Sequence, residues 1–386
     1  MAMGRGGSAV KTKLGFLLYG EQGTWKSSLA LQLLKFKRED GKPFRVLYID
    51  PEQGSVDSYL EKYEEDGIDL ANLFIIYTQS ISEVKTFINR AKNNQDFYEF
   101  NENGEETDKV YLDADGLPFR PDAIVIDGVT LLYVAKQQSM LEFSKKRATV
   151  RAMKKELIGM AKDVAIEGAG IEIKDYQSLK FEGQDLILDL LGCGKHFVVT
   201  CREEDEKEQY KDSNGEIKSM ATGRKQPSGF KDVRYNVKTV IRLFKDDDGL
   251  IKGIIENKDR TMIHQQDEVL IEPTLLDWQK VIDKNANKKE FNIANNLDKA
   301  VETERKAIEK ENAKFDEMLN QEDSEATSDL TTVEDFKNAI STKIKKLTPT
   351  EKSKKQTEIV KAGLPKAFLK SENLEELKQI YNIVAS

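Results

Sequence analysis

The chain has 386 residues, enough for one large domain and an appendage, and its formal net charge is −8. It has no apolar run long enough to span a membrane, and its Gly-rich start lacks the apolar core of a signal peptide, so we expect a cytoplasmic protein. The charge excludes a uniformly basic coat for nucleic acid but is compatible with a local basic groove. The two cysteines, Cys193 and Cys201, match no metal-binding spacing, which indicates buried reduced thiols.

From Lys13 to Trp278, short apolar runs alternate with helical patterns, which predicts an α/β core with a mainly parallel central sheet flanked by helices. Five runs are rich in β-branched and aromatic residues, as strands buried on both faces tend to be. These are Leu14–Tyr19, Arg45–Ile49, Leu73–Tyr77, Ala123–Ile126 and Phe197–Thr200. Two later runs, Thr239–Phe244 and Leu250–Glu256, flank a polar turn and predict an antiparallel hairpin.

The first predicted strand leads into Gly-Glu-Gln-Gly-Thr-Trp-Lys-Ser at residues 20–27. This matches the phosphate-binding pattern G-x-x-x-x-G-K-[ST], except that Trp25 replaces the second glycine. In such a loop, backbone N–H groups surround phosphates, the lysine reaches the β- and γ-phosphate oxygens, and the hydroxyl is a Mg²⁺ ligand. We therefore expect ATP and Mg²⁺ as ligands. The loop residues expected to bind the nucleotide are Gly20, Glu21, Gln22, Gly23, Thr24, Trp25, Lys26, Ser27 and Ser28.

The bulky ring of Trp25 has two consequences for the loop. We expect this residue to avoid a backbone conformation that only glycine adopts readily. We also expect the indole to pack beside the nucleotide or a neighbouring subunit.

Polar side chains follow three of the predicted strands. Asp127 ends an apolar run, which suits a carboxylate that joins Ser27 in holding Mg²⁺. Glu52 follows the second strand and is expected to orient or deprotonate the attacking water, with Asp50 as the less favoured candidate. Thr200 ends a later strand, and its position resembles that of a polar side chain that senses the γ-phosphate in RecA-like folds; a hydroxyl that only caps the strand is equally ordinary.

Three segments lie outside the strand pattern. Residues 93–121 have few core residues and two Gly turns, which predicts a surface hairpin inserted in a core of residues 1–283. Residues 284–330 are highly charged and predict a solvated helix that fades into an acidic linker over 320–329. Residues 331–386 contain 11 Lys and 7 acidic residues and predict a small helical domain that begins at a capping box, Thr332 and Asp335.

These motifs together resemble phage-encoded RecA-like P-loop ATPases. In that family the catalytic glutamate follows the second strand, as Glu52 does here, and Gly128 rather than a glutamate follows Asp127. The nearest subgroup is the core-only recombinases associated with single-strand annealing. The resemblance covers about residues 13–278, and within this range it is carried by the phosphate loop and by residues 48–53, 123–128, 175–179 and 257–261. Two features depart from the family: Trp25, and the lack of an obvious N-terminal polymerisation segment.

The resemblance implies a role for Lys258 and Arg260, which follow the predicted hairpin. Such a Lys-x-Arg pair resembles the finger with which a RecA-like subunit reaches the γ-phosphate on its neighbour. The structural alternative is a solvated cationic hairpin end.

It also implies that single-stranded DNA is held by the long polar segment 201–235, which we interpret as a flexible loop. Its basic second half is the favoured part, with one aromatic for base stacking. The candidate DNA-binding residues are Lys218, Arg224, Lys225, Phe230, Lys231 and Arg234. A second basic cluster at 145–155 is more typical of a solvated helix face.

The hypothesis that follows is a single-stranded-DNA-binding ATPase of phage recombination or strand annealing, in the cytoplasm of a bacterial host. It would assemble with itself in a ring or filament, and its C-terminal domain would contact a single-strand-binding protein or another replication or recombination protein. The alternatives are a ring helicase or helicase-loading motor, and an assembly switch that binds ATP but hydrolyses it slowly.

Overall fold

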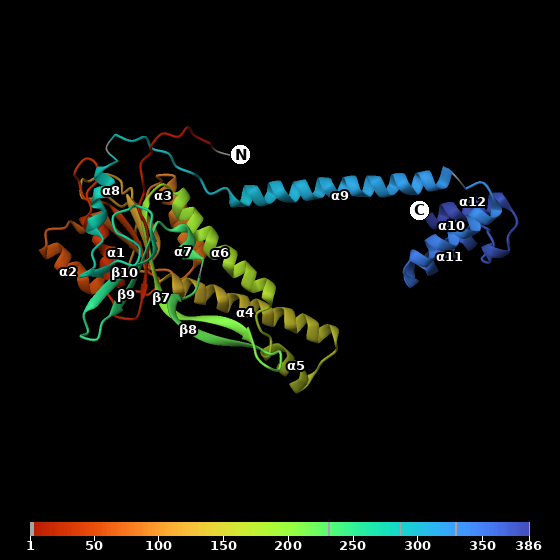
Figure 1. Cartoon of the computed structure of the whole chain (residues 1–386), viewed down its shortest axis with the longest axis horizontal. Helices are drawn as coiled ribbons and strands as arrows, with labels where there is room; N and C mark the ends of the chain where they lie inside the picture. The colour runs from red at the N-terminus through yellow and green to blue at the C-terminus, as the bar shows by residue number, and fades with distance from the viewer. Residues whose placement is uncertain (1–3, 231, 286, 329, 386) are drawn as a thin grey trace. The chain divides into compact units, whose positions relative to one another are not determined.

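The computed structural model describes residues 4–230, 232–285, 287–328 and 330–385 (Figure 1). The chain divides into two compact units, Met1–Leu297 and Asp298–Ser386. The first is an α/β core and the second is helical. Among the described residues, none of the helices combines the length and the apolar character that crossing a bilayer requires.

One central sheet organises the core, with strand order β11-β10-β9-β1-β7-β6-β2-β3 and with β8 paired to β7. Neighbouring strands are parallel from β9 to β3. β10 runs antiparallel to both of its neighbours, β9 and β11. The strands are β1 (Gly15–Gly20), β2 (Val46–Ile49), β3 (Leu73–Ile76), β6 (Ala123–Asp127), β7 (His196–Lys211), β8 (Ile217–Pro227), β9 (Thr239–Lys245), β10 (Ile251–Asp259) and β11 (Val269–Ile271). Every run predicted as a strand is a strand here, including the β9–β10 hairpin.

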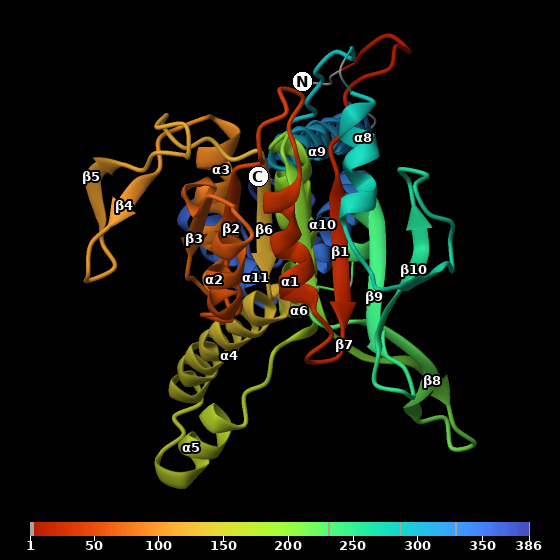
Figure 2. The same cartoon turned by 90° about the vertical axis from the view of Figure 1, so that its left-hand side faces the viewer.

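Helices cover both faces of this sheet (Figure 2). One face carries α3 (Ile81–Lys92), α4 (Val129–Lys154), α6 (Ile173–Gly192) and α7 (Val233–Asn236), and the other carries α1 (Lys26–Leu31), α2 (Asp57–Glu65) and α8 (Gln279–Asp283). Short 3₁₀ turns lie at Gln32–Lys35, Leu70–Asn72 and Leu276–Trp278. On β1, Leu17 and Tyr19 enter one core and Phe16 and Leu18 the other, because successive side chains of a strand point to opposite faces. The predicted fold class, a mainly parallel sheet between helices with a helical C-terminal unit, is confirmed.

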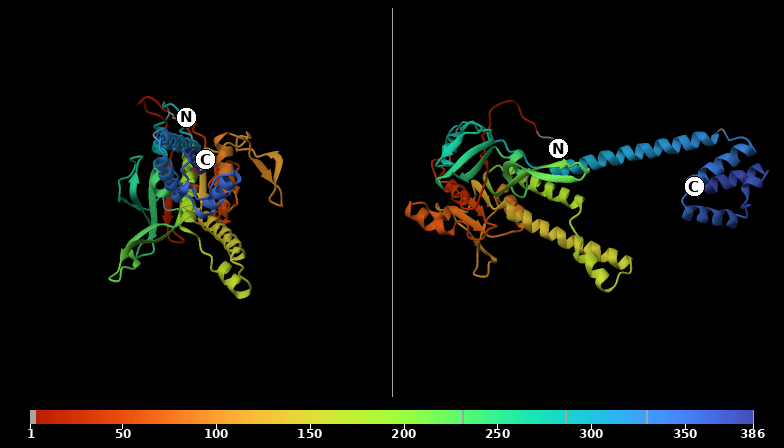
Figure 3. Two further views of the ribbon diagram at one scale, coloured as in Figure 1. Left: turned by 90° about the vertical axis from the view of Figure 1, so that its right-hand side faces the viewer. Right: turned by 60° about the horizontal axis from the view of Figure 1, so that its bottom comes forward.

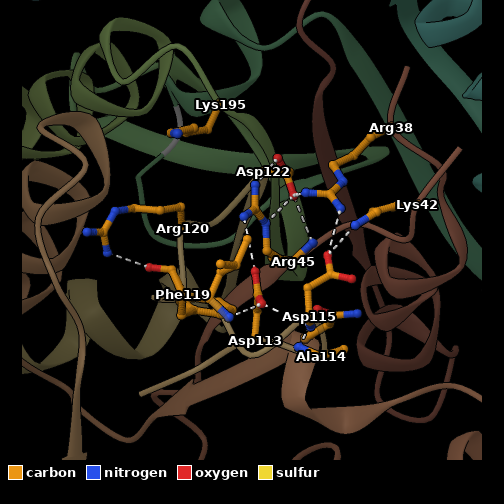
Figure 4. Close-up of polar contacts among 12 residues, drawn as sticks. Arg38, Lys42, Arg45, Asp113, Ala114, Asp115, Phe119, Arg120, Asp122 and Lys195 are labelled. Carbon is orange, nitrogen blue, oxygen red and sulfur yellow. Dashed lines mark hydrogen bonds and ion pairs between the residues drawn. The ribbon is translucent and has the colours of Figure 1, made fainter. Parts of the chain in front are cut away.

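The predicted insertion is an antiparallel hairpin of β4 (Tyr98–Phe100) and β5 (Glu106–Val110). Ion pairs fix its return to the core (Figure 4). The Arg45 guanidinium lies between two carboxylates, with Nε 2.9 Å from Asp122 and Nη1 3.2 Å from Asp113. Lys42 lies 2.9 Å from Asp115 in the same cluster.

The segment 201–235 differs from the predicted flexible loop. β7 continues past the sheet to Lys211 and pairs with β8, so that the two form a long antiparallel ribbon with a turn at Gly215. A ribbon with water on both faces needs no apolar alternation, so its strands lack the pattern by which strands are recognised in a sequence.

A helical arm of α4 and α5 (Gly159–Glu167) projects from the same edge of the sheet as the ribbon, and the two diverge (Figures 2 and 3). Part of the basic cluster on α4 makes internal contacts. Lys145 lies 2.8 Å from Glu167, and Arg151 lies 2.8 Å from Glu172. These ion pairs bind the arm's later segments to α4.

The second unit contains α9 (Leu297–Ser328), α10 (Val333–Lys346), α11 (Pro349–Lys361), a 3₁₀ turn at Phe368–Lys370 and α12 (Leu374–Ala385). Its last three helices share a small core that includes Ile340, Ile359 and Leu377. The predicted capping box is present, because the Thr332 hydroxyl accepts a hydrogen bond from the Asp335 N–H and the Asp335 carboxylate accepts one from the Thr332 N–H.

Candidate functional site: a nucleotide cavity at the sheet edge

The loop at residues 20–27 joins β1 to α1 at the edge where the parallel strands end. Gly20 is required there, because a Cβ on it would lie 2.0 Å from the carbonyl oxygen of Leu243 on β9. The loop borders a cavity of about 670 Å³. The other residues that line this cavity are Glu52, Tyr59, Arg202, Glu203 and Lys225.

The Trp25 backbone differs from the expectation drawn from its side chain. Its φ of 64° and ψ of 20° place it in the left-handed region that favours glycine. A non-glycine residue pays about 1–2 kcal/mol there, so the loop keeps the turn expected of the missing glycine at the cost of local strain. The ring is 49% exposed and forms part of the cavity wall.

Lys26 supplies a positive charge inside the loop. Its Nζ donates hydrogen bonds to the carbonyl oxygens of Gly20, at 3.1 Å, and Glu21, at 2.5 Å. Burial lowers the pKa of Lys26, while the nearby carboxylates of Glu52 and Asp127 act in the opposite direction. Both acidic groups predicted for the site therefore favour the charged form of Lys26 electrostatically.

Asp127 ends β6 and is buried, with three hydroxyl groups on its carboxylate. One oxygen accepts from the Tyr48 hydroxyl at 2.7 Å and the Ser55 hydroxyl at 2.6 Å, and the other accepts from Thr200 at 2.6 Å. Burial raises the pKa of Tyr48 well above its usual range, so the phenol remains a proton donor. The Thr200 hydroxyl, predicted to sense a phosphate, is directed to Asp127 instead.

Asp50 has a structural task. Its buried carboxylate accepts hydrogen bonds from four successive backbone N–H groups at 2.8–3.0 Å, those of residues 52–55. These bonds fix the turn after β2, which places Glu52 at the cavity. A carboxylate engaged in this way is not available as a base, so Glu52 remains the candidate.

Glu52 is held by a residue that the sequence did not indicate. Arg202, on β7 just past the sheet edge, donates to one Glu52 oxygen from Nε at 3.2 Å and from Nη2 at 3.0 Å. Gly128 permits this arrangement, because a Cβ on it would lie 2.8 Å from the Glu52 Cγ. In the sequence, the one feature that points to Arg202 is its position two residues after Thr200, just past a strand end.

The donor set fits a magnesium nucleotide. The Ser27 hydroxyl and the Asp127 carboxylate are hard oxygen donors at the same edge of the sheet. In the described part of the chain there is no cluster of three or more His, Cys, Asp or Glu side chains placed to hold a metal. Such a cluster is not needed, because Mg²⁺ commonly takes one or two protein ligands and completes its shell with phosphate and water.

Lys258 and Arg260 lie at the opposite edge of the sheet. β10 runs antiparallel to β9, so Asp259 is opposite Thr239, whereas the loop's Gly20 is opposite Leu243. Thr239 and Leu243 are four residue steps apart along β9, and at about 3.3 Å a step the two edges are separated by roughly 13 Å. The structure therefore does not bring this pair together with its own subunit's loop. Burial and the nearby Arg260 lower the pKa of Lys258 to about 8.

The predicted DNA-binding residues are dispersed. Lys218, Arg224 and Lys225 lie on β8, and Arg234 lies on α7. Lys218 is 2.6 Å from Asp212 and Lys225 is 2.9 Å from Asp205, so two of these cations are paired within the ribbon. Lys225 also lines the nucleotide cavity. Lys231 lies outside the described residues.

Phe230 is not the exposed stacking aromatic that the sequence suggests. It is 4% exposed and belongs to the core beneath α4 and α6, with its ring centroid 5.2 Å from that of Tyr133. A lone aromatic in a polar segment more readily anchors that segment to a core than remains in water.

Comparisons with known proteins add a fold-level similarity. No family model matches the chain, and no curated protein matches it. Among solved structures, the chain is similar to a KaiC-like protein from the hyperthermophilic archaeon Pyrococcus horikoshii OT3, with a TM-score of 0.36 and 13% identity. The match covers 68% of this chain and 91% of the archaeal one. A similarity at this level carries no functional conclusion.

Proposed function

We propose that this protein is a Mg²⁺-dependent ATPase that is completed at subunit interfaces and stimulated by single-stranded DNA. One observation carries the proposal: a phosphate-binding loop holding Lys26 borders a cavity at the sheet edge where Glu52 and Asp127 also lie. Lys26 begins α1, Glu52 follows β2 and Asp127 ends β6.

Each residue has a distinct task in this proposal. Lys26 and the loop N–H groups would bind the phosphates, and Ser27 and Asp127 would hold Mg²⁺, which would neutralise phosphate charge. Glu52 accepts a proton from the attacking water, a contribution of about 10²–10⁴-fold for a well-placed base. Tyr48, Ser55 and Asp50 position these carboxylates.

Two features support self-association, in a ring or a filament. Lys258 and Arg260 cannot reach their own subunit's cavity from the opposite sheet edge, so a role in hydrolysis requires a second copy. The helical arm exposes several large apolar side chains, and exposed apolar surface of this kind is a feature of protein contacts. They include Val150, Met153, Ile158, Met160 and Val164.

The DNA part of the proposal rests on the ribbon. Its cations, among them Lys207, Lys211 and Arg224, would contact the DNA backbone without reading bases, and binding would weaken with salt. Surface ion pairs such as Lys218–Asp212 are weak enough to be exchanged for phosphate contacts. From the sequence resemblance, we place the activity in phage recombination or strand annealing in a bacterial host, with the C-terminal unit as a contact for another replication or recombination protein.

ATP hydrolysis measured with and without single-stranded DNA tests the proposal. We expect Lys26→Ala to lose both ATP binding and hydrolysis. Glu52→Gln should still bind ATP but lose about 10²–10⁴-fold in turnover. Matched controls are Lys109→Ala on β5 and Glu61→Gln on α2, both exposed. Normal turnover in Glu52→Gln would contradict the assignment of the base.

A second candidate function is a slow nucleotide-gated assembly switch. It is favoured by the Arg202–Glu52 ion pair, in which the guanidinium engages an oxygen of the proposed catalytic base. ATP-dependent assembly with negligible turnover, with or without DNA, would support it. Unwinding of a forked duplex would instead indicate a helicase or helicase-loading motor.

A further inference from the structure

A second, smaller cavity lies where the ribbon returns to the core. Its volume is about 230 Å³, and α4, α6 and the segment after β8 form its walls. Its apolar lining consists of three aromatic rings, those of Tyr133, Tyr176 and Phe230, together with Leu179. Tyr176 and Leu179 belong to the stretch 175–179 that the sequence singles out and that the nucleotide site does not use.

The aromatic floor of this cavity is fixed by packing. The Tyr133 and Phe230 rings meet edge to face, at 90°. Two glycines allow this approach. A Cβ on Gly183 would lie 2.4 Å from the Phe230 ring, and a Cβ on Gly229, whose φ is +96°, would lie 3.2 Å from the Tyr133 Cβ. Tyr176 differs from both rings because it is 47% exposed, which leaves one ring available at the entrance.

Polar groups lie beside these rings. The Gln184 amide donates to an Asp232 carboxylate oxygen at 3.0 Å, and the Lys180 ammonium lies 3.2 Å from the same oxygen. The cavity thus combines aromatic walls with an amide, a carboxylate and an ammonium. Proteins that recognise unstacked bases use the same combination, with aromatic rings for the face and polar groups for the edge.

We propose that this cavity, the Tyr176 pocket, takes a single unstacked base of single-stranded DNA. Its volume is below the roughly 300–1,000 Å³ of sites for drug-sized ligands, which suits one planar ring rather than a whole nucleotide. The proposal deepens the proposed function, since it rests on binding of single-stranded DNA. It also gives Phe230 a role as the floor of a base site rather than as an exposed stacking ring.

Hydrogen bonds join the Tyr176 pocket to Glu52, the proposed catalytic base. Gly229 and Phe230 follow Ser228, whose N–H donates to the Arg202 carbonyl at 2.7 Å and whose carbonyl accepts from the Thr130 hydroxyl at 3.1 Å. The Arg202 N–H in turn donates to the Thr130 hydroxyl at 3.0 Å, and the Arg202 side chain holds Glu52. A DNA base that enters the pocket and shifts residues 228–230 would therefore also shift Arg202. This contiguous network is the route by which bound DNA would release Glu52.

The test compares two oligomers with equal numbers of phosphates: a thymidine 30-mer and a fully abasic 30-mer. Full-length wild type, Tyr176→Ala and Tyr176→Phe are titrated with each in the presence of a non-hydrolysable ATP analogue. We expect Tyr176→Ala to weaken binding of the thymidine oligomer by about 5- to 150-fold, because one stacked base contributes about 1–3 kcal/mol. Tyr176→Phe keeps a ring and should restore most of this loss. Neither variant should change binding of the abasic oligomer.

Each of the other outcomes overturns either the base pocket alone or DNA binding as a whole. Equal losses for both oligomers, or none for the thymidine oligomer, would overturn the base pocket while leaving DNA binding intact. Failure of wild type to bind either oligomer would remove the DNA part of the proposed function, and the pocket with it. A change in self-association in Tyr176→Ala, with unchanged binding of the thymidine oligomer, would assign the pocket to a protein side chain and overturn the proposal. Thermal unfolding shows whether the variants fold. We expect that they do, because the Tyr176 ring is half-exposed and its loss removes little core packing.

Discussion

Arg202 donates two hydrogen bonds to a single carboxylate oxygen of Glu52, from Nε at 3.2 Å and from Nη2 at 3.0 Å. Glu52 belongs to the turn that Asp50 fixes after β2, whereas Arg202 lies where β7 passes from the sheet into the ribbon. An oxygen that already accepts two guanidinium hydrogen bonds is occupied, and it is not free to hold an attacking water in line. The pair therefore connects the position of the ribbon with the availability of the proposed base.

Removal of this arginine should increase turnover in the absence of DNA. We expect Arg202→Ala to raise DNA-independent ATP hydrolysis by up to about 5-fold, because exposed ion pairs contribute about 0.2–1 kcal/mol. Steady-state phosphate release measures the effect. Arg90→Ala is the matched control, since it removes an arginine–glutamate pair between Arg90 on α3 and Glu106 on the inserted hairpin. A fall in turnover in Arg202→Ala would mean that the guanidinium assists hydrolysis instead.

The sequence indicated the strand ends of the core well. Buried parallel strands are continuous apolar runs, and a polar residue that follows such a run lies at the sheet edge, which is how Asp127 and Glu52 could be placed. The loop could be placed for the same reason, because the spacing of Gly20 and Lys26 is itself the signal.

The contacts between strand ends could not be read in this way. Whether Arg202 meets Glu52, or Thr200 meets Asp127, depends on which strands are neighbours and on their register, and no local pattern contains that information. No sequence pattern indicates the ribbon, because strands exposed on both faces need no apolar alternation. The burial of Phe230 is likewise not visible in the sequence, because its partner Tyr133 is distant in the chain.

Substitutions at Trp25 should separate backbone strain from loss of the ring. Trp25→Gly and Trp25→Ala both remove the indole, but only glycine adopts a φ of 64° without penalty. We expect the glycine variant to exceed the alanine variant by about 1 kcal/mol in free energy of unfolding, measured with urea. ATP binding should survive in Trp25→Gly, because the loop already has the backbone turn of a glycine. Equal stabilities would show that the loop changes conformation when the ring is removed.

Mixing two inactive variants tests whether Arg260 acts on a neighbour. Arg260→Ala keeps its own loop and Glu52, whereas Glu52→Gln keeps its own Arg260. If the finger acts between subunits, each hybrid interface that joins an intact Glu52 to an intact Arg260 hydrolyses ATP, and mixing restores part of the activity measured by phosphate release. Lys258→Ala mixed with Arg260→Ala is the control, because both changes lie on the same finger. Absence of restoration would contradict the action in trans.

Glu256 on β10 gives the core a predictable dependence on pH. Burial, with a smaller contribution from Asp267, raises the pKa of Glu256 to about 7, compared with 4.5 for an ordinary glutamate. Between these values the folded protein binds more protons than the unfolded chain, so the free energy of unfolding falls as pH rises. This contribution is present below about pH 4.5 and is lost once pH exceeds about 7.

Glu256→Gln removes the titrating group and should therefore raise the Tm at pH 8, while the difference from wild type shrinks towards pH 5. Because the side chain is only half-buried, we expect a gain of no more than a few degrees. Glu268→Gln is a control of opposite sign, because hydrogen bonds from the Gln265 N–H and from His264 lower the pKa of Glu268, and that variant should lose stability at pH 8. Differential scanning calorimetry at both pH values measures the two effects. A gain in Glu256→Gln that is equal at pH 5 and pH 8 would show that packing, and not the charge on Glu256, limits the stability of β10.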